Sequence, residues 1–172
     1  MKVLFFGTPE FAVPALAALA RGGHRLAAAV TRPDQPRGRG QSVVEASPVA
    51  REAARLGIPI LRPARLSDPE FLAQARALAP DVIALAAYGH LIPSALLDLP
   101  PRGAWNIHPS LLPRWRGPAP IHRAILAGDA ETGVAIMRMV PRLDAGPVAL
   151  MERTPIGPAE TRGDLATRLA AV

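Results

Sequence analysis

The chain has 172 residues, of which 49% are hydrophobic and 4% aromatic, and its formal net charge is +6. This length and hydrophobicity predict one domain with a packed core, and they exclude a chain that is disordered throughout. The absence of cysteine excludes disulfides, thiolate metal ligands and a cysteine nucleophile.

No apolar run is long enough to span a membrane, and the apolar start at 3–6 is too short for the core of a signal peptide. We therefore expect no membrane association and a cytoplasmic location. All but one of the 20 basic residues are Arg. This excess fits either an Arg-rich overall composition or an anionic partner such as RNA, and composition alone does not decide between them.

Apolar runs bounded by turn residues predict strands, and segments with helical spacing predict helices. In chain order, the first half is expected to hold a strand at 2–6, a helix at 10–21, a strand at 26–30, a Pro- and Gly-rich loop at 31–48, a helix to 56 capped by Ser47, a strand at 58–61 and a helix at 69–78. The second half is expected to hold a strand at 81–87, a short helix at 93–97, a strand at 104–108, a helix at 118–127, successive strands at 132–140 and 147–154, and a helix starting at 164.

The alternation of strands and helices over the first two-thirds of the chain predicts a parallel sheet with right-handed crossovers. The last two strands follow each other without a helix, which predicts an antiparallel edge. The expected fold is therefore α/β: a Rossmann-like open, mostly parallel sheet with helices on both faces and an antiparallel edge. Ligands of such sheets bind at the carboxyl ends of the strands.

Two polar side chains end the strand at 104–108. Asn106 and His108 are two residues apart, so they point to the same side of the strand, and Pro109 keeps His108 extended. An amide donor beside an imidazole suits a reaction in which an oxyanion develops and a proton moves. Such a short pattern is more often structural when it stands alone.

Asp144 lies in the loop after the strand at 132–140. If that strand is next to the strand at 104–108, the loop can bring the Asp144 carboxylate to His108 and fix its tautomer. Asp-Ala-Gly is also ordinary turn chemistry, so Asp144 alone is no stronger a signal than the pair on the strand.

Several other kinds of site are not supported. The first strand is followed by neither a phosphate-binding P-loop nor a G-x-G-x-x-G sequence. The four histidines lack the spacing of metal ligands, so we expect no metal site. Ser110 has no G-x-S-x-G context, which argues against a serine nucleophile.

Basic residues gather in two loops. Arg32, Arg37 and Arg39 lie in the 31–48 loop, and Arg114 and Arg116 flank Trp115 after the strand at 104–108. Arg and aromatic side chains suit phosphate contact and base stacking, although either cluster alone is equally a solvated loop.

Taken together, these stretches are far more specific than each is alone. NIHPSLLPRWRGPAPI at 106–121, GDAETGV at 128–134 and LDAG at 143–146 closely resemble the formyltransferases that use 10-formyltetrahydrofolate. FGTPEFAVP at 6–14 and TRPDQPRGRG at 31–40, followed by SPV at 47–49, are similar to the members of that family that formylate methionyl-initiator-tRNA. The resemblance covers essentially the whole chain.

The resemblance implies that the catalytic residues are Asn106, His108 and Asp144 and that the formyl donor is 10-formyltetrahydrofolate, with no metal. It implies that the folate is bound by Ser110, Leu111, Leu112 and Pro113, by Tyr88, Gly89, Leu91 and Ile92, and by Val140 and Leu143. It also implies that tRNA is contacted by Arg32, Arg37, Arg39, Arg114 and Arg116. Related sequences often have Lys after Gly-Arg-Gly, where this chain has Gln41-Ser42.

Members of this family usually continue into a smaller β-barrel-like domain that helps to hold tRNA. We expect residues 1–172 to form the catalytic domain, with 31–48 as an inserted basic loop, without that second domain. We expect a monomer.

Two alternatives stay open. The first is a formyltransferase of the same fold that acts on a sugar-nucleotide amine or on glycinamide ribonucleotide. The second is a folate- or RNA-binding module without catalysis, which an intact Asn106, His108 and Asp144 set argues against.

Overall fold

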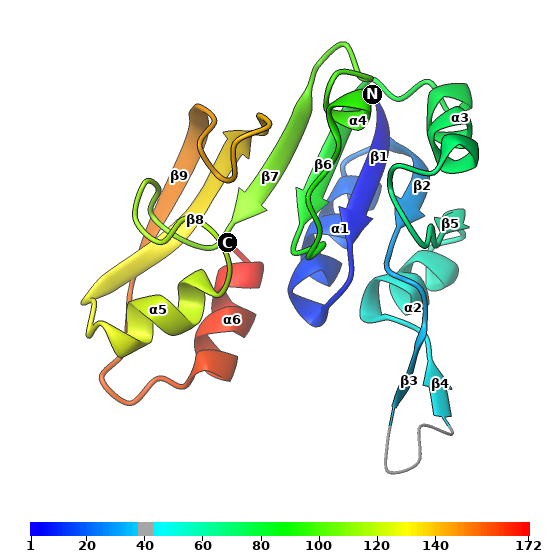
Figure 1. The fold of residues 1–172 in the computed structure, drawn as a ribbon. Coiled ribbons are helices and arrows are strands. Elements are labelled where there is room, and N and C mark those ends of the chain that lie inside the picture. Colours follow the sequence, from blue (N-terminus) through cyan, green and yellow to red (C-terminus); the bar gives the residue numbers. More distant parts are fainter. Residues whose placement is uncertain (38–42) are drawn as a thin grey trace.

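The computed structural model describes residues 1–37 and 43–172, with side chains at 1–34 and 45–172. Its main feature is a seven-stranded sheet in the order β5-β2-β1-β6-β7-β8-β9 (Figure 1). The strands are β1 (Lys2–Gly7), β2 (Arg25–Val30), β5 (Ile60–Leu61), β6 (Val82–Ala86), β7 (Ala104–His108), β8 (Glu131–Arg138) and β9 (Val148–Pro155). The five strands from β5 to β7 are parallel, and β8 and β9 are antiparallel. The predicted α/β fold is confirmed.

Helices cover both faces of the sheet (Figure 1). They are α1 (Val13–Arg21), which follows the 3-10 turn η1 (Glu10–Ala12), α2 (Pro48–Arg55), α3 (Pro69–Ala77), α4 (Ser94–Leu97), α5 (Pro120–Leu126) and α6 (Arg162–Ala170). Packing of α1 and α2 buries Leu16 and Val49 against one face of β1, while α3 and α4 bury Phe71 and Leu96 on the other. A separate cluster joins α5 and α6 to β8. The apolar burial on both faces explains why the central strands read as continuous hydrophobic runs.

The segment at 31–48 is not wholly a loop, contrary to the prediction. It contains an antiparallel ribbon of β3 (Gln35–Arg37) and β4 (Val43–Glu45). The two chain segments that lead into and out of the ribbon are joined by a hydrogen bond, since the Oγ1 of buried Thr31 and the Oγ of Ser47 are 2.7 Å apart. Ser47 also caps α2 by accepting a hydrogen bond from the Ala50 N–H at 3.1 Å, as its place before Pro48 predicted. Two consecutive Val residues in β4 favour strand structure, a signal that the flanking Pro and Gly residues masked.

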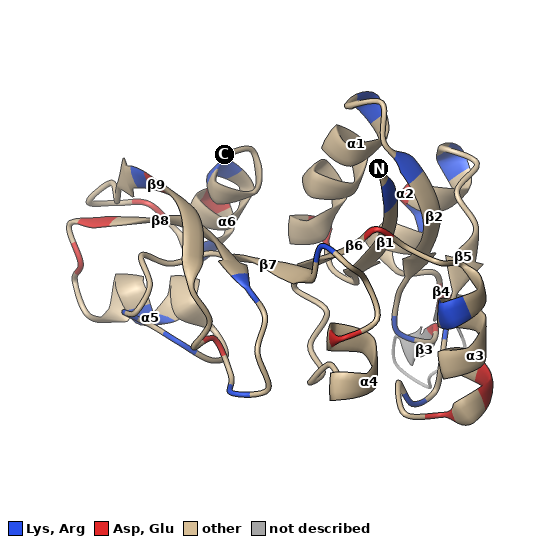
Figure 2. Cartoon of the chain, turned by 90° about the horizontal axis from the view of Figure 1, so that it is seen from above, with Lys and Arg blue, Asp and Glu red and all other residues tan. Residues whose placement is uncertain are grey.

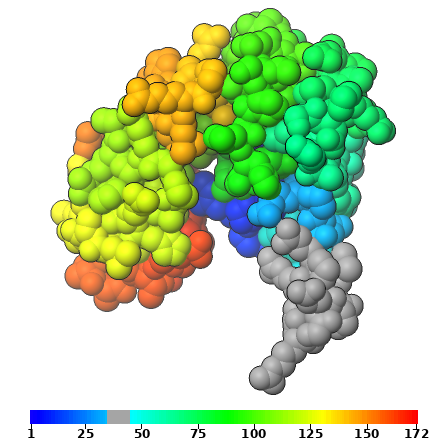
Figure 3. Space-filling model, in the orientation of Figure 1, coloured from blue at the N-terminus to red at the C-terminus, as the bar shows by residue number. Residues whose placement is uncertain are grey.

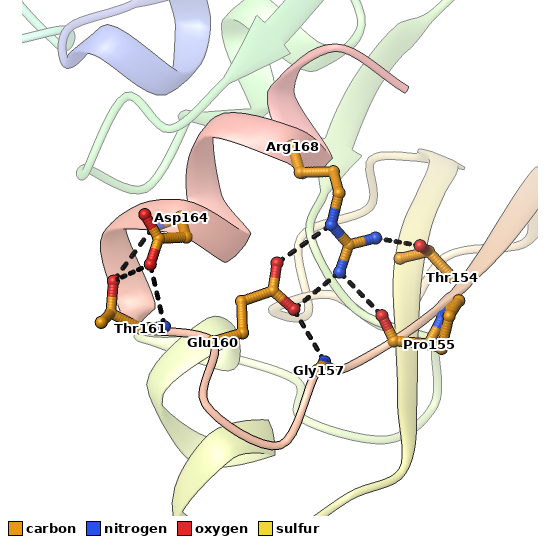
Figure 4. A network of polar contacts seen from close by, with 7 residues as sticks. All are labelled: Thr154, Pro155, Gly157, Glu160, Thr161, Asp164 and Arg168. Atoms are coloured by element: carbon orange, nitrogen blue, oxygen red, sulfur yellow. Dashed lines mark hydrogen bonds and ion pairs between the residues drawn. The ribbon is translucent and has the colours of Figure 1, made fainter.

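The last helix begins at Arg162, two residues before the predicted start, because Thr161 and Asp164 form a capping box (Figure 4). The Thr161 Oγ1 accepts from the Asp164 N–H at 3.3 Å, and the Asp164 carboxylate accepts from the Thr161 N–H at 3.1 Å. The Arg168 guanidinium then ties the helix to β9 by donating to Glu160, the Thr154 hydroxyl and the Pro155 carbonyl oxygen. These contacts fix α6 against the antiparallel edge of the sheet.

Candidate active site

A cleft of about 1230 Å³ lies at the carboxyl ends of the parallel strands. It is lined by the loops that follow β6, β7 and β8, by the segment 63–67 and by Arg32 at the base of the ribbon. Figure 3 shows the hollow between the yellow and orange segments on one side and the green and cyan segments on the other. The position agrees with the place where open α/β sheets bind ligands.

Asn106 and His108 lie on β7 and both line this cleft. They are buried, and the alternation of the strand puts them on the same side, as predicted. The antiparallel pairing with β8 sets Asn106 opposite Met137 and His108 opposite Ala135. The small Ala135 side chain and the flexible Met137 side chain leave room beside the two polar groups.

Asp144 reaches the same point from the loop after β8, and its backbone adopts a left-handed conformation with φ 43°. Asp tolerates this region better than most residues. Its carboxylate accepts hydrogen bonds from the Gly117 N–H at 2.8 Å and from the Asn106 Nδ2 at 3.4 Å. The loop therefore brings the carboxylate to β7 because β8 is the neighbour of β7, which is the condition that the sequence left open.

The His108 ring has an oxygen at each nitrogen. Its Nε2 lies 3.0 Å from the Trp115 carbonyl oxygen, and its Nδ1 lies 3.6 Å from the Asp144 Oδ2. A carbonyl oxygen only accepts, so in this arrangement Nε2 carries a hydrogen. The two oxygens together fix the orientation of the imidazole ring. The structure thus brings the three predicted catalytic residues together, while their roles stay a prediction.

The residues expected to bind folate fall into two groups. Those of the first group line the cleft: Tyr88, Gly89, Leu91 and Ile92 from the loop after β6, and Val140 and Leu143 from the loop after β8. Those of the second group, Ser110, Leu111, Leu112 and Pro113, are not among the residues that line it. Ser110 is fully buried and its hydroxyl donates to the Arg114 carbonyl oxygen at 2.7 Å, and Leu112 packs on Ala135 and Met137. The folate-binding role of these four residues stays a prediction.

Tyr88 belongs to the loop after β6 and is almost fully buried, and its ring makes an edge-to-face contact with Phe6. Burial raises the pKa of its hydroxyl above the ordinary value, and the nearby Arg32 charge opposes that rise. Arg32 lies at the mouth of the cleft, close to Gly89. Its guanidinium is therefore placed to meet an anionic group of a ligand in the cleft as well as one outside it.

The predicted tRNA-binding arginines are in different surroundings. Arg114 donates to Asp129 with two nitrogens, at 2.6 and 2.9 Å, and its guanidinium lies over the Trp115 ring. The Arg37 side chain and the whole of Arg39 fall outside the described residues, as do Gln41 and Ser42. Figure 2 shows that Lys and Arg lie at both ends of the sheet and are interspersed with Asp and Glu. None of the described contacts tests the tRNA role, which stays a prediction.

Among the described residues, no group of three or more His, Cys, Asp or Glu side chains could hold a metal ion. No helix in the described part of the chain is long and apolar enough to cross a membrane. The cleft also contains residues that the sequence did not single out, such as Arg65, Ser67 and Met139. Arg65 and Ser67 reach the cleft because the 63–67 segment packs beside the loop after β6, and no motif marks that segment.

The fold and these three side chains define a chemical class: an α/β protein whose cleft presents an amide, an imidazole and a carboxylate suited to acyl transfer. The chain belongs to the formyl transferase family, whose sequence profile matches residues 1–172.

Relatives named methionyl-tRNA formyltransferase are similar over almost the whole chain. The protein of Methylobacterium sp. (strain 4-46) is 54% identical over 98% of this chain and 54% of its own length. That of Moorella thermoacetica (strain ATCC 39073 / JCM 9320) is 49% identical over 100% of this chain and 55% of its own length. The chain thus spans about half the length of the curated relatives it matches.

Solved structures with the same fold carry another name. Glycinamide ribonucleotide transformylase 1 from Geobacillus kaustophilus is 30% identical, with a TM-score of 0.78 over 98% of this chain and 90% of that chain. Phosphoribosylglycinamide formyltransferase from Bacillus halodurans is 25% identical, with a TM-score of 0.81 over 99% of this chain and 88% of that chain. The family resemblance predicted from the motifs is therefore confirmed.

Proposed function

We propose that the protein transfers the formyl group of 10-formyltetrahydrofolate to the α-amino group of methionyl-initiator-tRNA, giving the formylmethionyl-tRNA that starts translation. The observation that carries this proposal is the meeting of Asn106, His108 and Asp144 at the cleft, where Asn106 and His108 each lie within hydrogen-bond or ion-pair distance of Asp144. Identity of about half of the residues to proteins named methionyl-tRNA formyltransferase supports the choice of acceptor.

The chemistry follows from the three side chains. The neutral amine attacks the formyl carbon, a C–N bond forms, and the carbonyl oxygen becomes an oxyanion. Asn106 donates an N–H to that oxygen, and protonated His108 stabilises the same charge. Asp144, directly or through a water, accepts the proton that the attacking nitrogen loses, and the same proton passes to the leaving nitrogen. The bond to the leaving nitrogen then breaks, and tetrahydrofolate departs.

The cleft fits a folate-type substrate in size and chemistry. A volume of about 1230 Å³ is enough for a drug-sized heterocycle with a tail. Apolar side chains from two loops, Leu91 and Ile92 on one side and Val140 and Leu143 on the other, face the cleft and suit the flat faces of such a ring. We place the folate there, with Tyr88 and Gly89 on the same wall as Leu91.

The tRNA would lie outside the cleft, along the segment at 31–48, whose sequence includes Arg32, Arg37 and Arg39, and toward Arg114 and Arg116. Backbone phosphates are the sequence-independent partners of such Arg residues. In this proposal residues 1–172 act as the catalytic domain, as a monomer in the cytoplasm. A protein in which a further domain follows residues 1–172 should bind tRNA more tightly than residues 1–172 alone.

The test offers 10-formyltetrahydrofolate together with methionyl-tRNA, glycinamide ribonucleotide or an amino-sugar nucleotide, and identifies which amine is formylated. Formylation of methionyl-tRNA alone is expected. Formylation of one of the other amines would replace the acceptor and keep the reaction. Binding of folate without any product, unchanged by His108→Ala, would show that the protein is a binding module.

A further inference from the structure

Asp129 lies just before β8, outside the cleft, and its carboxylate binds two residues of the loop after β7. It is absent from the residues that line the cleft, and its side chain is 14% exposed. The carboxylate accepts the bidentate pair of hydrogen bonds from Arg114 and a third from the Trp115 indole Nε1 at 2.7 Å. Three donors from two adjacent residues therefore converge on one carboxylate, which fixes the side chains at this point of the loop.

The same loop also contacts His108 and Asp144 through its backbone. The Trp115 carbonyl oxygen is the partner of His108 Nε2, and the Gly117 N–H donates to Asp144. Trp115 has φ 59°, a left-handed conformation that a large side chain rarely adopts. A backbone held in this region needs contacts that outweigh its cost, and Asp129 supplies them to the Trp115 indole and to the preceding Arg114.

A carboxylate in these contacts stays ionised. The hydrogen bonds from Arg114, and secondly from Trp115, lower the pKa of Asp129 below its ordinary value. The charge of Asp129 is therefore present throughout the neutral pH range. Its hydrogen bonds to the loop are then independent of pH in that range.

We infer that Asp129 is a positioning residue: it fixes the Arg114–Trp115 turn so that the Trp115 carbonyl oxygen orients the His108 ring toward Asp144. This inference rests on the proposed formyl transfer for its kinetic test. Its geometric part concerns only the ring of His108 and can be tested without any turnover.

A nearby ion pair offers a matched control. Glu131 lies two residues further along the chain and pairs with Arg153 of β9 at 2.5 Å, with both side chains more than half exposed. Neither residue lines the cleft, and the contact between them runs across the sheet from β9 to β8 rather than to the loop after β7. Glu131→Gln therefore removes a carboxylate charge from the same region while leaving the loop intact.

The experiment compares Asp129→Asn, Asp129→Glu and Glu131→Gln with the unchanged protein. Asp129→Asn cannot accept all three hydrogen bonds, so kcat is expected to fall about tenfold or more, since small misplacements of a reacting group are costly. The KM for 10-formyltetrahydrofolate should stay within about twofold, because no cleft residue changes. Asp129→Glu should recover part of kcat, and Glu131→Gln should change kcat by less than about twofold, as for an exposed ion pair.

The second measurement is the ring N–H signal of His108 in 15N-histidine NMR spectra, identified by its loss in His108→Gln. The unchanged protein and Glu131→Gln are expected to show a hydrogen-bonded Nε2–H, and Asp129→Asn is expected to lose it. Retention of that signal and of kcat in Asp129→Asn would overturn the inference, as would a fall in kcat matched by Glu131→Gln. If the unchanged protein formylates no acceptor, the proposed function fails, and the NMR comparison still decides the role of Asp129.

Discussion

Gly146 closes the loop that carries Asp144, and replacing it with Ala should damage the site more than the fold. A Cβ at this position would lie 1.8 Å from the Arg138 carbonyl oxygen, whereas real Cβ atoms do not come closer than 3.0 Å. The two atoms must therefore move apart by at least 1.2 Å. Arg138 is held by its pairing with Trp105 on β7, so the loop has to move rather than the strand.

A shift of this size at Gly146 reaches Asp144 two residues away. Displacing a catalytic group by about 1 Å costs about a hundredfold in rate, or about 2.7 kcal/mol of transition-state stabilisation. We expect Gly146→Ala to lower kcat/KM by about that factor, with a loss of unfolding free energy of about 1–3 kcal/mol from the overpacked turn.

Gly157→Ala is the matched control, because a Cβ there meets its nearest atom, the Glu160 Cβ, at an ordinary 3.5 Å. Both variants are assayed for formyl transfer at saturating folate and for urea denaturation. Equal kcat/KM values for Gly146→Ala and Gly157→Ala would refute the argument that the close approach at Gly146 sets the position of Asp144.

Three further predictions follow from single contacts. Asp144→Asn should lower kcat/KM by about a hundredfold, because the amide cannot accept from both donors and carries no charge opposite His108; steady-state kinetics within about threefold of the unchanged protein would contradict this. Arg168→Ala should lower the urea midpoint and leave turnover below the transition unchanged, since α6 loses its ties to β9; an unchanged midpoint would contradict it. Tyr88 is the single tyrosine, so its ultraviolet absorbance in an alkaline titration reports one group. Because its folded-state pKa is raised, its contribution to stability is complete below the ordinary value of 10.0 and is lost as pH rises through the folded-state value. Arg32→Ala should raise the midpoint of this titration further, and a lower midpoint in that variant would show that the Arg32 charge does not favour the ionised form. A midpoint of the unchanged protein at or below 10.0 would show that burial is not the dominant cause.

The fold could be predicted because its signals are local. Buried strands of a parallel sheet are continuous apolar runs, and the run at 82–86 is covered on both sides as expected. The placement of Asn106 and His108 on one side of a strand follows from the two-residue period alone. The sequence alone does not reveal Thr161 as a cap, because a capping box depends on reciprocal hydrogen bonds between Thr161 and Asp164.

What the sequence could not provide are contacts between distant residues in irregular backbone. The left-handed conformation of Trp115 and the bidentate pair of Arg114 with Asp129 arise only when the loop after β7 folds against the start of β8. In the sequence Arg114 and Arg116 are equivalent members of a basic cluster. In the structure Arg114 forms an ion pair with Asp129, so its positive charge is partly neutralised.

Asn106 shows how the same contacts prepare the site for a reaction. The side-chain amide carries two hydrogens on Nδ2, and the contact with Asp144 uses one of them. That contact orients the plane of the amide. The direction of the second N–H is therefore set before a substrate binds. Asp144 faces His108 with its other oxygen, so a single carboxylate contacts both side chains. Preorganised donors of this kind need no rearrangement as the oxyanion forms, and this is why the loss of the Asp144 carboxylate should cost more than the loss of one hydrogen bond.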